Sequence, residues 1–369
     1  MHLKMNSNSK FQFNKVLTIG LGQLGLPVAK YVKEKGFDVY GYDISFAAMD
    51  RAQEIAGIKR IDDHNNDISK NINAYDFSEF DVFIICVSTH KPDDMFSPQI
   101  DGLLSIVEKI AKEAKNGALV SIESTIPKGT SKKVFEMLNH RLHVAHAPHR
   151  WYALEQEEHG VNQLRVLGGV CQCCLDVAMD FYDGGIASNG NNGGSGKDSK
   201  QQQRPELQQE QQDHEQIQAN DTTTITYSHK SLGIHMHPVP QIEIAEITKI
   251  AENAHRYLQI AFAEDLYLYC QANNINFAEL RYALNTKWNV NILEPRDGIG
   301  GHCLPKDTKM FLQSSKSIKS KILASAIEVD EDYRRYRQTR VSKPILSPPS
   351  LSMQSIPPSN FREDPTLDQ

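Results

Sequence analysis

One cysteine of this chain lies in a setting suited to chemistry. Cys303 belongs to the segment GIGGHCLPKD (298–307), in which several glycines flank the thiol. Glycines leave room for a ligand beside the sulfur, and Lys306 and His302 would favour the thiolate form. A thiolate can attack a carbonyl carbon and hold the acyl group between two chemical steps. We therefore predict that Cys303 is a covalent nucleophile.

A glycine motif near the N-terminus has the spacing of a dinucleotide-binding turn. The segment GLGQLG (20–25) follows the apolar run VLTI and opens a helical stretch. The first glycine permits the tight bend, the second admits a pyrophosphate, and the third lets helix and strand pack closely. Asp43 ends the next apolar run; an acid there bonds a ribose 2′-hydroxyl and repels a 2′-phosphate, which predicts NAD rather than NADP. The predicted cofactor contacts in this region are Gly20, Gly22, Gln23, Leu24, Gly25 and Asp43.

Some other cysteines and histidines suggest a metal site at first sight. Cys171, Cys173 and Cys174 are close in sequence, but neighbours on a predicted helix point in different directions. No second ligand pair at zinc spacing follows them. His143 and His146 lie on a predicted strand and face opposite sides of it. We therefore predict no bound metal.

Short apolar runs alternate with helical patterns up to about residue 182. Nearly continuous apolar strands are typical of a parallel sheet that helices cover on both faces. We therefore predict an α/β fold that begins with a Rossmann-type, doubly wound parallel sheet. The predicted strands are 16–20, 38–43, 81–88, 118–124 and 142–147.

The second block, residues 238–340, is dominated by helical periodicity. Residues 241–274 keep this periodicity without a proline and predict a single helix of about 50 Å, at 1.5 Å per residue. A helix of that length commonly spans a subunit interface. We therefore expect a homodimer that pairs through this helix about a two-fold axis.

Two stretches differ in composition from these blocks. Residues 201–218 are half glutamine, and the chain from Val341 is rich in proline and serine. Such segments have little apolar surface to offset the entropy cost of ordering them. The predicted organisation is an NAD-binding domain (1–182), a disordered insertion (183–228), an α-helical central dimerisation domain with the cysteine motif (229–340), and a disordered tail (341–369).

Composition argues against several classes of protein. The formal net charge of −6 provides no general attraction for nucleic acid. The sequence has no apolar run of about 18 residues, which predicts no membrane span, and its N-terminus lacks the apolar core of a secretory signal. Six cysteines in 369 residues do not form a disulfide framework, so a reducing, cytoplasmic setting is expected. Cys86 and Cys270 are predicted to be small buried apolar residues.

Together these features resemble the UDP-glucose/GDP-mannose dehydrogenase family of NAD-dependent nucleotide-sugar 6-dehydrogenases. Five segments carry the resemblance, and they cover most of the chain that is predicted to be ordered. In chain order they are GLGQLGLPVAK (20–30), CVSTH (86–90), ESTIPKGT (123–130), AEITKIAENAHRYLQIAFAEDL (245–266) and GGHCLPKDTKMFL (300–312). The last two are the most specific.

The resemblance implies a four-electron oxidation of a sugar C6 alcohol to a carboxylate, with NAD as acceptor and a thioester on Cys303 as an intermediate. Lys249 and Asn253 share a helix face and would stabilise the developing alkoxide. The implied catalytic residues are Cys303, Lys249, Asn253, Asp307, Thr125 and His149. Further implied cofactor contacts are Val87, Thr89 and Thr125. The implied contacts to the UDP-sugar substrate are Arg150, Lys249, Asn253, Gly300 and Gly301.

Two features depart from the family pattern. His149 stands where the family has a glutamate near the reacting carbon; a neutral imidazole can still act as a base near pH 7. Arg150 is expected to pair with a diphosphate. Only 62 residues follow Asp307, so most of the family's C-terminal nucleotide-binding domain is expected to be absent. A solvated acidic loop is expected at Glu155, Glu157 and Glu158.

The sequence leaves more than one function open. The glycine run before His302 and the segment NILEP (291–295) are similar to the N-acetylhexosamine branch, whereas LPKD is more like the UDP-glucose and GDP-mannose branches. The expected substrate is UDP-N-acetyl-D-mannosamine, with UDP-glucose as the alternative. A two-electron β-hydroxyacid-type dehydrogenase is also open, although it has no use for Cys303. So is a truncated paralogue that binds NAD without turnover.

Overall fold

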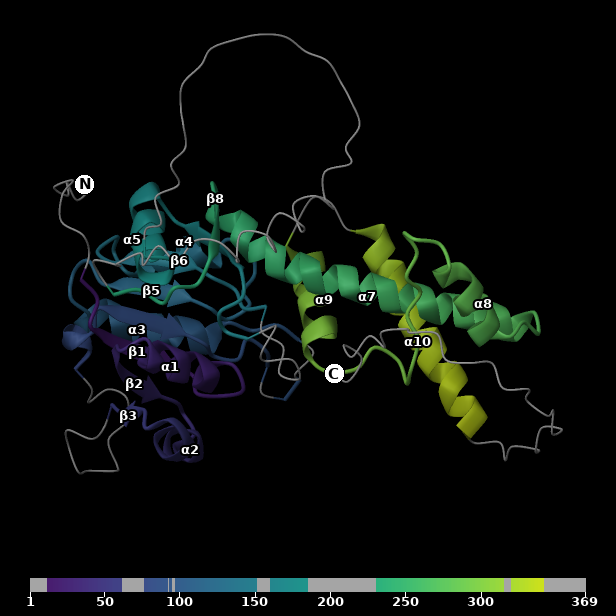
Figure 1. Cartoon of the computed structure of the whole chain (residues 1–369), viewed down its shortest axis with the longest axis horizontal. Coiled ribbons are helices and arrows are strands. Elements are labelled where there is room, and N and C mark those ends of the chain that lie inside the picture. The colour runs from purple at the N-terminus through teal and green to yellow at the C-terminus, as the bar shows by residue number, and fades with distance from the viewer. Residues whose placement is uncertain are drawn as a thin grey trace, which may run out of the picture.

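The computed structural model describes residues 12–61, 76–91, 93–94, 97–150, 160–184, 230–314 and 320–341. An α/β part, purple to teal in Figure 1, is followed by a helical part in green and yellow. This two-part architecture confirms the predicted fold class. Three predicted features lie wholly or almost wholly outside the described residues: the insertion at 183–228, the tail at 341–369 and the acidic loop at Glu155, Glu157 and Glu158.

Eight strands among the described residues form one sheet, in the order β3-β2-β1-β4-β5-β6-β7-β8. Neighbouring strands are parallel, except that β6 and β7 are antiparallel. All five predicted strands are present; β3, β7 and β8 are additions, and β8 comes from the stretch assigned to the helical domain. The strands are β1 (Lys15–Ile19), β2 (Asp38–Tyr42), β3 (Lys59–Arg60), β4 (Val82–Ile85), β5 (Leu119–Ile122), β6 (His143–His146), β7 (Arg165–Gly169) and β8 (Met236–Val239).

Helices cover both faces of this sheet, which explains why its strands are apolar on both sides. On β1, Val16 belongs to the buried cluster beneath α1, α2 and α5, whereas its neighbour Leu17 belongs to the cluster beneath α3 and α4. Successive strand residues point to opposite faces, so a doubly wound sheet needs an unbroken apolar run. These helices are α1 (Gly25–Glu34), α2 (Phe46–Ala56), α3 (Asp101–Glu113), α4 (Thr130–Met137) and α5 (Gln172–Tyr182).

The helical part is built on α7, which runs from the sheet through the whole of the second part (Figure 1). Its 31 residues correspond to about 46 Å at 1.5 Å per residue, close to the predicted helix. Both α9 and α10 pack against it. No described helix is long and apolar enough to cross a membrane. The helices of this part are α7 (Ile242–Ala272), α8 (Phe277–Asn285), α9 (Cys303–Gln313) and α10 (Lys321–Val341).

The α7 helix is attached to the α/β part through a buried carboxylate. Glu246 is fully buried, and its two oxygens accept hydrogen bonds from the backbone N–H groups of Gly129 (2.6 Å) and Ser131 (2.8 Å). Those groups lie at the start of α4, where backbone N–H groups lack partners within their own helix. This contact anchors the N-terminal end of α7 to the start of α4.

Candidate active site

The glycine loop lies between β1 and α1 and has little room for side chains. A Cβ atom on Gly20 would lie 2.5 Å from the carbonyl oxygen of Cys86, and Gly20 has φ +88°. A Cβ atom on Gly25 would lie 1.7 Å from the carbonyl oxygen of Gly20. A Cβ atom on Gly22 would meet nothing within 4 Å, so this side of the loop is open to a ligand. The arrangement fits a pyrophosphate at the N-terminus of α1.

Asp43 follows β2 and is held beside this loop. One carboxylate oxygen accepts a hydrogen bond from the Leu21 N–H (2.7 Å), and the other accepts one from the Ser45 N–H (2.8 Å). Gln23 and Leu24 lie on the same turn, and Leu24 is the N-cap of α1. The structure therefore brings the predicted adenosine-side contacts together, and the residues present fit a dinucleotide.

The predicted nicotinamide contacts follow β4 and β5. Val87 and Thr89 come after β4, and Thr125 comes after β5. The Ser124 hydroxyl donates a hydrogen bond to the Val87 carbonyl (2.8 Å), which joins the two loops. Thr89 is buried, and its hydroxyl lies 3.4 Å from the Lys306 ammonium nitrogen on α9. The cofactor end of the sheet thus contacts the helix that carries the cysteine motif.

A buried polar cluster joins α7 to α9. The Asn253 amide donates a hydrogen bond to one Asp307 oxygen (2.5 Å), and Lys306 lies 2.5 Å from the other. Asp307 and Lys306 are both buried. The structure therefore brings Asn253 and Asp307 together as the sequence predicts, and it adds Lys306 as the buried cation that links this pair to Thr89.

Cys303 is the first residue of α9, and its Sγ lies 3.5 Å from the Nε2 of His302. Its side chain is exposed, yet its pKa is raised, because burial of its surroundings and then the charge of Asp307 disfavour the thiolate. Lys306 and Lys249 oppose this shift, as expected of positive charges. Lys306 thus favours the thiolate as predicted, but desolvation and the carboxylate of Asp307 outweigh it, so the pKa of Cys303 is raised overall.

His149 lies in a second buried network. Its Nε2 forms a short contact with Glu123 and lies 3.0 Å from an Arg165 nitrogen. Burial, then the charges of Arg165 and, less strongly, Lys249 lower the pKa of His149 to about 4, although Glu123 opposes this. His149 is therefore neutral near pH 7, as the sequence suggests. Its Nε2, however, is committed to Glu123, so this nitrogen is not available as a base.

Glu123 is the anionic centre of this network. Burial raises the pKa of its carboxyl, but the charge of Arg165 and the contact with His149 outweigh burial and bring it to about 2. An Arg165 nitrogen lies 3.2 Å from one Glu123 oxygen, and the Tyr182 hydroxyl donates to the other. The Tyr182 hydroxyl also lies 2.7 Å from that of Ser121. Residue spacing in the sequence does not reveal Arg165 and Tyr182, because the order of the strands brings Arg165 to Glu123 and the packing of α5 on the sheet brings Tyr182 there.

The remaining predicted substrate contacts are Arg150 and the glycines before Cys303. Arg150 pairs with Glu252 on α7 (2.5 Å), and about a third of each side chain is exposed. Gly300 and Gly301 precede Cys303; a Cβ atom on Gly300 would meet nothing within 4 Å, and Gly301 has φ +70°. Glycine tolerates this backbone conformation with little strain. The loop therefore approaches the thiol without side chains of its own in the way.

Two family models match this chain. The NAD-binding-domain model of the UDP-glucose/GDP-mannose dehydrogenase family matches residues 14–184, and the central-domain model of the same family matches residues 243–332. The chain belongs to the UDP-glucose/GDP-mannose dehydrogenase family. It therefore carries this family's NAD-binding domain, which identifies the cofactor as NAD and the class of protein as an NAD-dependent oxidoreductase.

Curated relatives of this family member are similar over most of the chain. It is 29% identical to a UDP-N-acetyl-D-mannosamine dehydrogenase from Campylobacter jejuni, over 97% of this chain and 83% of that protein. It is 27% identical to the protein of the same name from Methanococcus maripaludis, over 90% of this chain and 68% of that protein.

Solved structures show the same fold. The UDP-D-ManNAc dehydrogenase from Pyrococcus horikoshii superimposes with a TM-score of 0.63 at 24% identity, over 89% of this chain and 70% of that one. A 3-hydroxyisobutyrate dehydrogenase from Mycobacterium tuberculosis gives a TM-score of 0.54 at 12% identity, over 88% of this chain and 94% of that one. The fold is thus shared with a protein whose name refers to another substrate, so the substrate must be inferred from the site.

Proposed function

We propose that this chain catalyses the four-electron oxidation of the C6 alcohol of a nucleotide sugar to a carboxylate. The observation that supports this most is the position of Cys303 at the start of α9, four residues before an Asp307 bonded to Asn253 and Lys306. A two-electron dehydrogenase has no need of a thiol at this position. Bound NAD supplies the chemistry of accepting a hydride in each oxidation step.

The residues of the chain divide the remaining work. Lys249 and Asn253 stabilise the alkoxide that forms as the alcohol loses its proton. The Cys303 sulfur bonds to C6 of the resulting aldehyde, and its proton passes to the carbonyl oxygen, which gives a thiohemiacetal. A second hydride and a proton then leave, and a thioester remains. Water cleaves the C–S bond to release the carboxylate and restore the thiol, with Asp307 and Thr125 positioning that water.

The raised pKa of the Cys303 thiol determines when the thiol loses its proton in these steps. A thiol that stays protonated in the resting site is protected from unproductive reactions, because the thiolate is the reactive form. Its deprotonation is then coupled to the arrival of the aldehyde, whose oxygen takes up the proton. Lys306 and Lys249, whose charges lower this pKa, assist that transfer.

The proposed substrate is UDP-N-acetyl-D-mannosamine, with UDP-glucose as the alternative. The names of the C. jejuni and M. maripaludis relatives support the first, as does the glycine run before His302.

A homodimer through α7 is also proposed, because large apolar side chains remain exposed on that helix. Phe262 is 58% exposed and Tyr269 is 57% exposed. Large exposed apolar side chains are common at subunit interfaces.

The test is the number of NADH molecules formed per sugar across a panel of UDP- and GDP-sugars. Two per molecule of UDP-N-acetyl-D-mannosamine, with the uronate as product, is the expected result. Cys303→Ser should stop formation of the uronate, whereas Cys270→Ala, which removes a thiol near the C-terminal end of α7, should not. One NADH per sugar would support the two-electron alternative. NAD binding without turnover of any panel member would support the non-catalytic alternative.

A further inference from the structure

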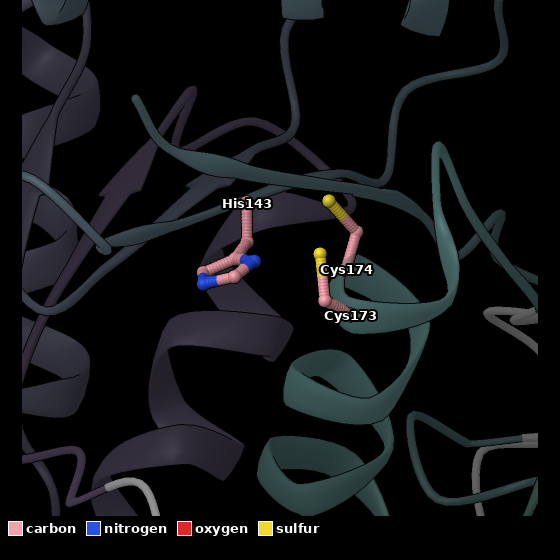
Figure 2. Close-up of side chains that lie close together, drawn as sticks. All are labelled: His143, Cys173 and Cys174. Carbon is pink, nitrogen blue, oxygen red and sulfur yellow. The ribbon is translucent and has the colours of Figure 1, made fainter. Parts of the chain in front are cut away.

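Three cysteines and a histidine meet at the start of α5, away from the cofactor loop. Cys171 is the N-cap of α5, and Cys173 and Cys174 lie in its first turn. The antiparallel pairing of β6 and β7 sets Ala145 opposite Gly169 and His146 opposite Gly168. Beyond these pairs the Val170 N–H donates a hydrogen bond to the Val144 carbonyl (3.1 Å), so the chain continues beside β6 as far as the N-cap Cys171. Figure 2 shows the His143 ring and the sulfurs of Cys173 and Cys174 facing the same space.

The donor atoms are close enough to share one ion. A ring nitrogen of His143 and the sulfurs of Cys173 and Cys174 all lie within 4.8 Å of one another. The Cys171 sulfur lies 2.7 Å from that of Cys173 and 3.3 Å from that of Cys174. Ligand sulfurs of a tetrahedral zinc ion lie about 3.8 Å apart when each Zn–S bond is about 2.3 Å. The Cys171 sulfur lies outside this group of three donors, so rotation of its side chain is needed to bring it to the same ion as the fourth ligand.

We propose that His143, Cys171, Cys173 and Cys174 form a tetrahedral zinc site that joins β6 to α5. Three thiolates and one imidazole are a common ligand set of structural zinc. The sequence alone predicts no metal here, because neighbouring cysteines on a helix diverge. The structure differs because β6 places His143 beside the first turn of α5. The sulfurs of Cys173 and Cys174 both face its ring there (Figure 2).

Burial raises the thiol pKa of Cys173 and Cys174 in the metal-free chain, so a bound cation must displace their protons, and two features of the surroundings favour that exchange. The Val144 N–H donates a hydrogen bond to the Cys174 sulfur (3.4 Å), as outer hydrogen bonds to metal-bound sulfur do. The first turn of α5 holds no acidic residue, and its free N–H groups favour negative charge. Cys174 and His143 are buried, whereas Cys173 is exposed, so an ion can enter from the Cys173 side.

The position of the cluster points to a structural role. His143 lies at the N-terminal end of β6, which is parallel to β5, whereas the active-site residues follow the carboxyl ends of β4 and β5. The site is thus at the opposite edge of the sheet from Thr89 and Thr125. Zinc there would hold α5 against β6 just after the antiparallel strand β7. Its presence does not depend on the proposed dehydrogenase activity.

The test is metal content and cobalt binding of the reduced full-length chain. Purification without chelators should give one zinc per chain, and Co²⁺ added after chelation should give the sulfur-to-cobalt charge-transfer band and intense ligand-field bands of a tetrahedral thiolate site. Cys173→Ser and His143→Gln should weaken Co²⁺ binding by more than the roughly 10- to 100-fold that loss of an outer hydrogen-bond partner causes. Cys303→Ser is the matched control and should bind Co²⁺ as wild type does.

Three results would overturn the proposal. The first is no zinc and no cobalt spectrum in a reduced chain that still binds NAD, which shows that the fold is intact. The second is an unchanged cobalt affinity in both Cys173→Ser and His143→Gln. The third is a Cys171–Cys174 disulfide in the protein as isolated, found by mass spectrometry, together with no metal uptake after reduction; that result would assign the cluster to thiol–disulfide chemistry.

Discussion

Glu264 is a buried carboxyl group in the middle of α7. Its side chain is fully buried, and among the described residues neither of its oxygens has a hydrogen-bond partner. Burial, and second the negative charge of Asp330 on α10, raise the pKa of Glu264 to about 8, and Arg334 opposes this only in part. The group is therefore protonated in the folded chain at neutral pH. We predict that it makes the stability of this chain fall as the pH rises.

The magnitude follows from the difference between the two states. In the unfolded chain a glutamate titrates near its ordinary pKa of about 4.3. Below that pH both states carry the proton, so the stability contributed by the neutral group is fully present. Between about 4.3 and 8 the unfolded chain loses the proton while the folded chain keeps it, which costs about 1.4 kcal/mol per pH unit. From pH 5.5 to 7.5 the accumulated loss is about 2.5 kcal/mol.

Glu264→Gln removes this titration and keeps nearly the same shape. Urea unfolding at a fixed protein concentration, at pH 5.5, 6.5 and 7.5, should show the variant gaining about 2 to 3 kcal/mol on the wild type across this range. Asp265→Asn changes an exposed carboxylate on the next residue of the same helix and should leave the pH dependence of wild type unchanged. Parallel curves for wild type and Glu264→Gln would refute the reasoning, because they would mean that the group is ionised in the folded chain.

Three further experiments test the site. Arg165→Met should lower the free energy of unfolding by about 3 to 5 kcal/mol, because it leaves a buried carboxylate without its main cation; a loss under about 1 kcal/mol in urea would contradict the network. Gly20→Ala should lower the melting temperature, whereas Gly22→Ala should leave it nearly unchanged and weaken NAD binding in calorimetry; equal effects on melting would contradict the loop geometry. Alkylation of Cys303 by iodoacetamide should require a pH above that needed for a free thiol, and Asp307→Asn should lower that pH in a mass-spectrometric assay, because it removes a negative charge.

The elements that local sequence determines were predictable. The long helix is predicted at 241–274 and found at Ile242–Ala272, because an unbroken periodic run without proline leaves few alternatives. The strands β7 and β8 were not predicted, because each contains residues that are uncommon in strands. The first, RVLGG, ends in two glycines, and the second, MHPV, contains a histidine and a proline. The proline is tolerated because β8 is an edge strand, where one row of backbone groups makes no ladder bonds.

The buried network around Glu123 was not predictable from spacing. Arg165 is one of the largest fully buried side chains, although arginine is almost never fully buried unless it is paired. Its partner lies 42 residues earlier on a loop after β5, and the two meet only because β5, β6 and β7 are neighbours in the sheet. The polar pair Asn253 and Asp307, by contrast, could be named because each belongs to a segment that resembles the family.

The charge balance of this network explains how a histidine fits at position 149, where the resemblance implies a glutamate. Glu123 and Arg165 already form a buried pair of opposite charges. A second carboxylate beside them would be a like charge next to Glu123 in a dry site, whereas a neutral imidazole adds a polar contact and no charge. The substitution therefore preserves the pair but commits the His149 Nε2 to it. Under the proposed chemistry, the water that cleaves the thioester then depends on Asp307, whose carboxylate is held by Asn253 and Lys306 close to the thiol.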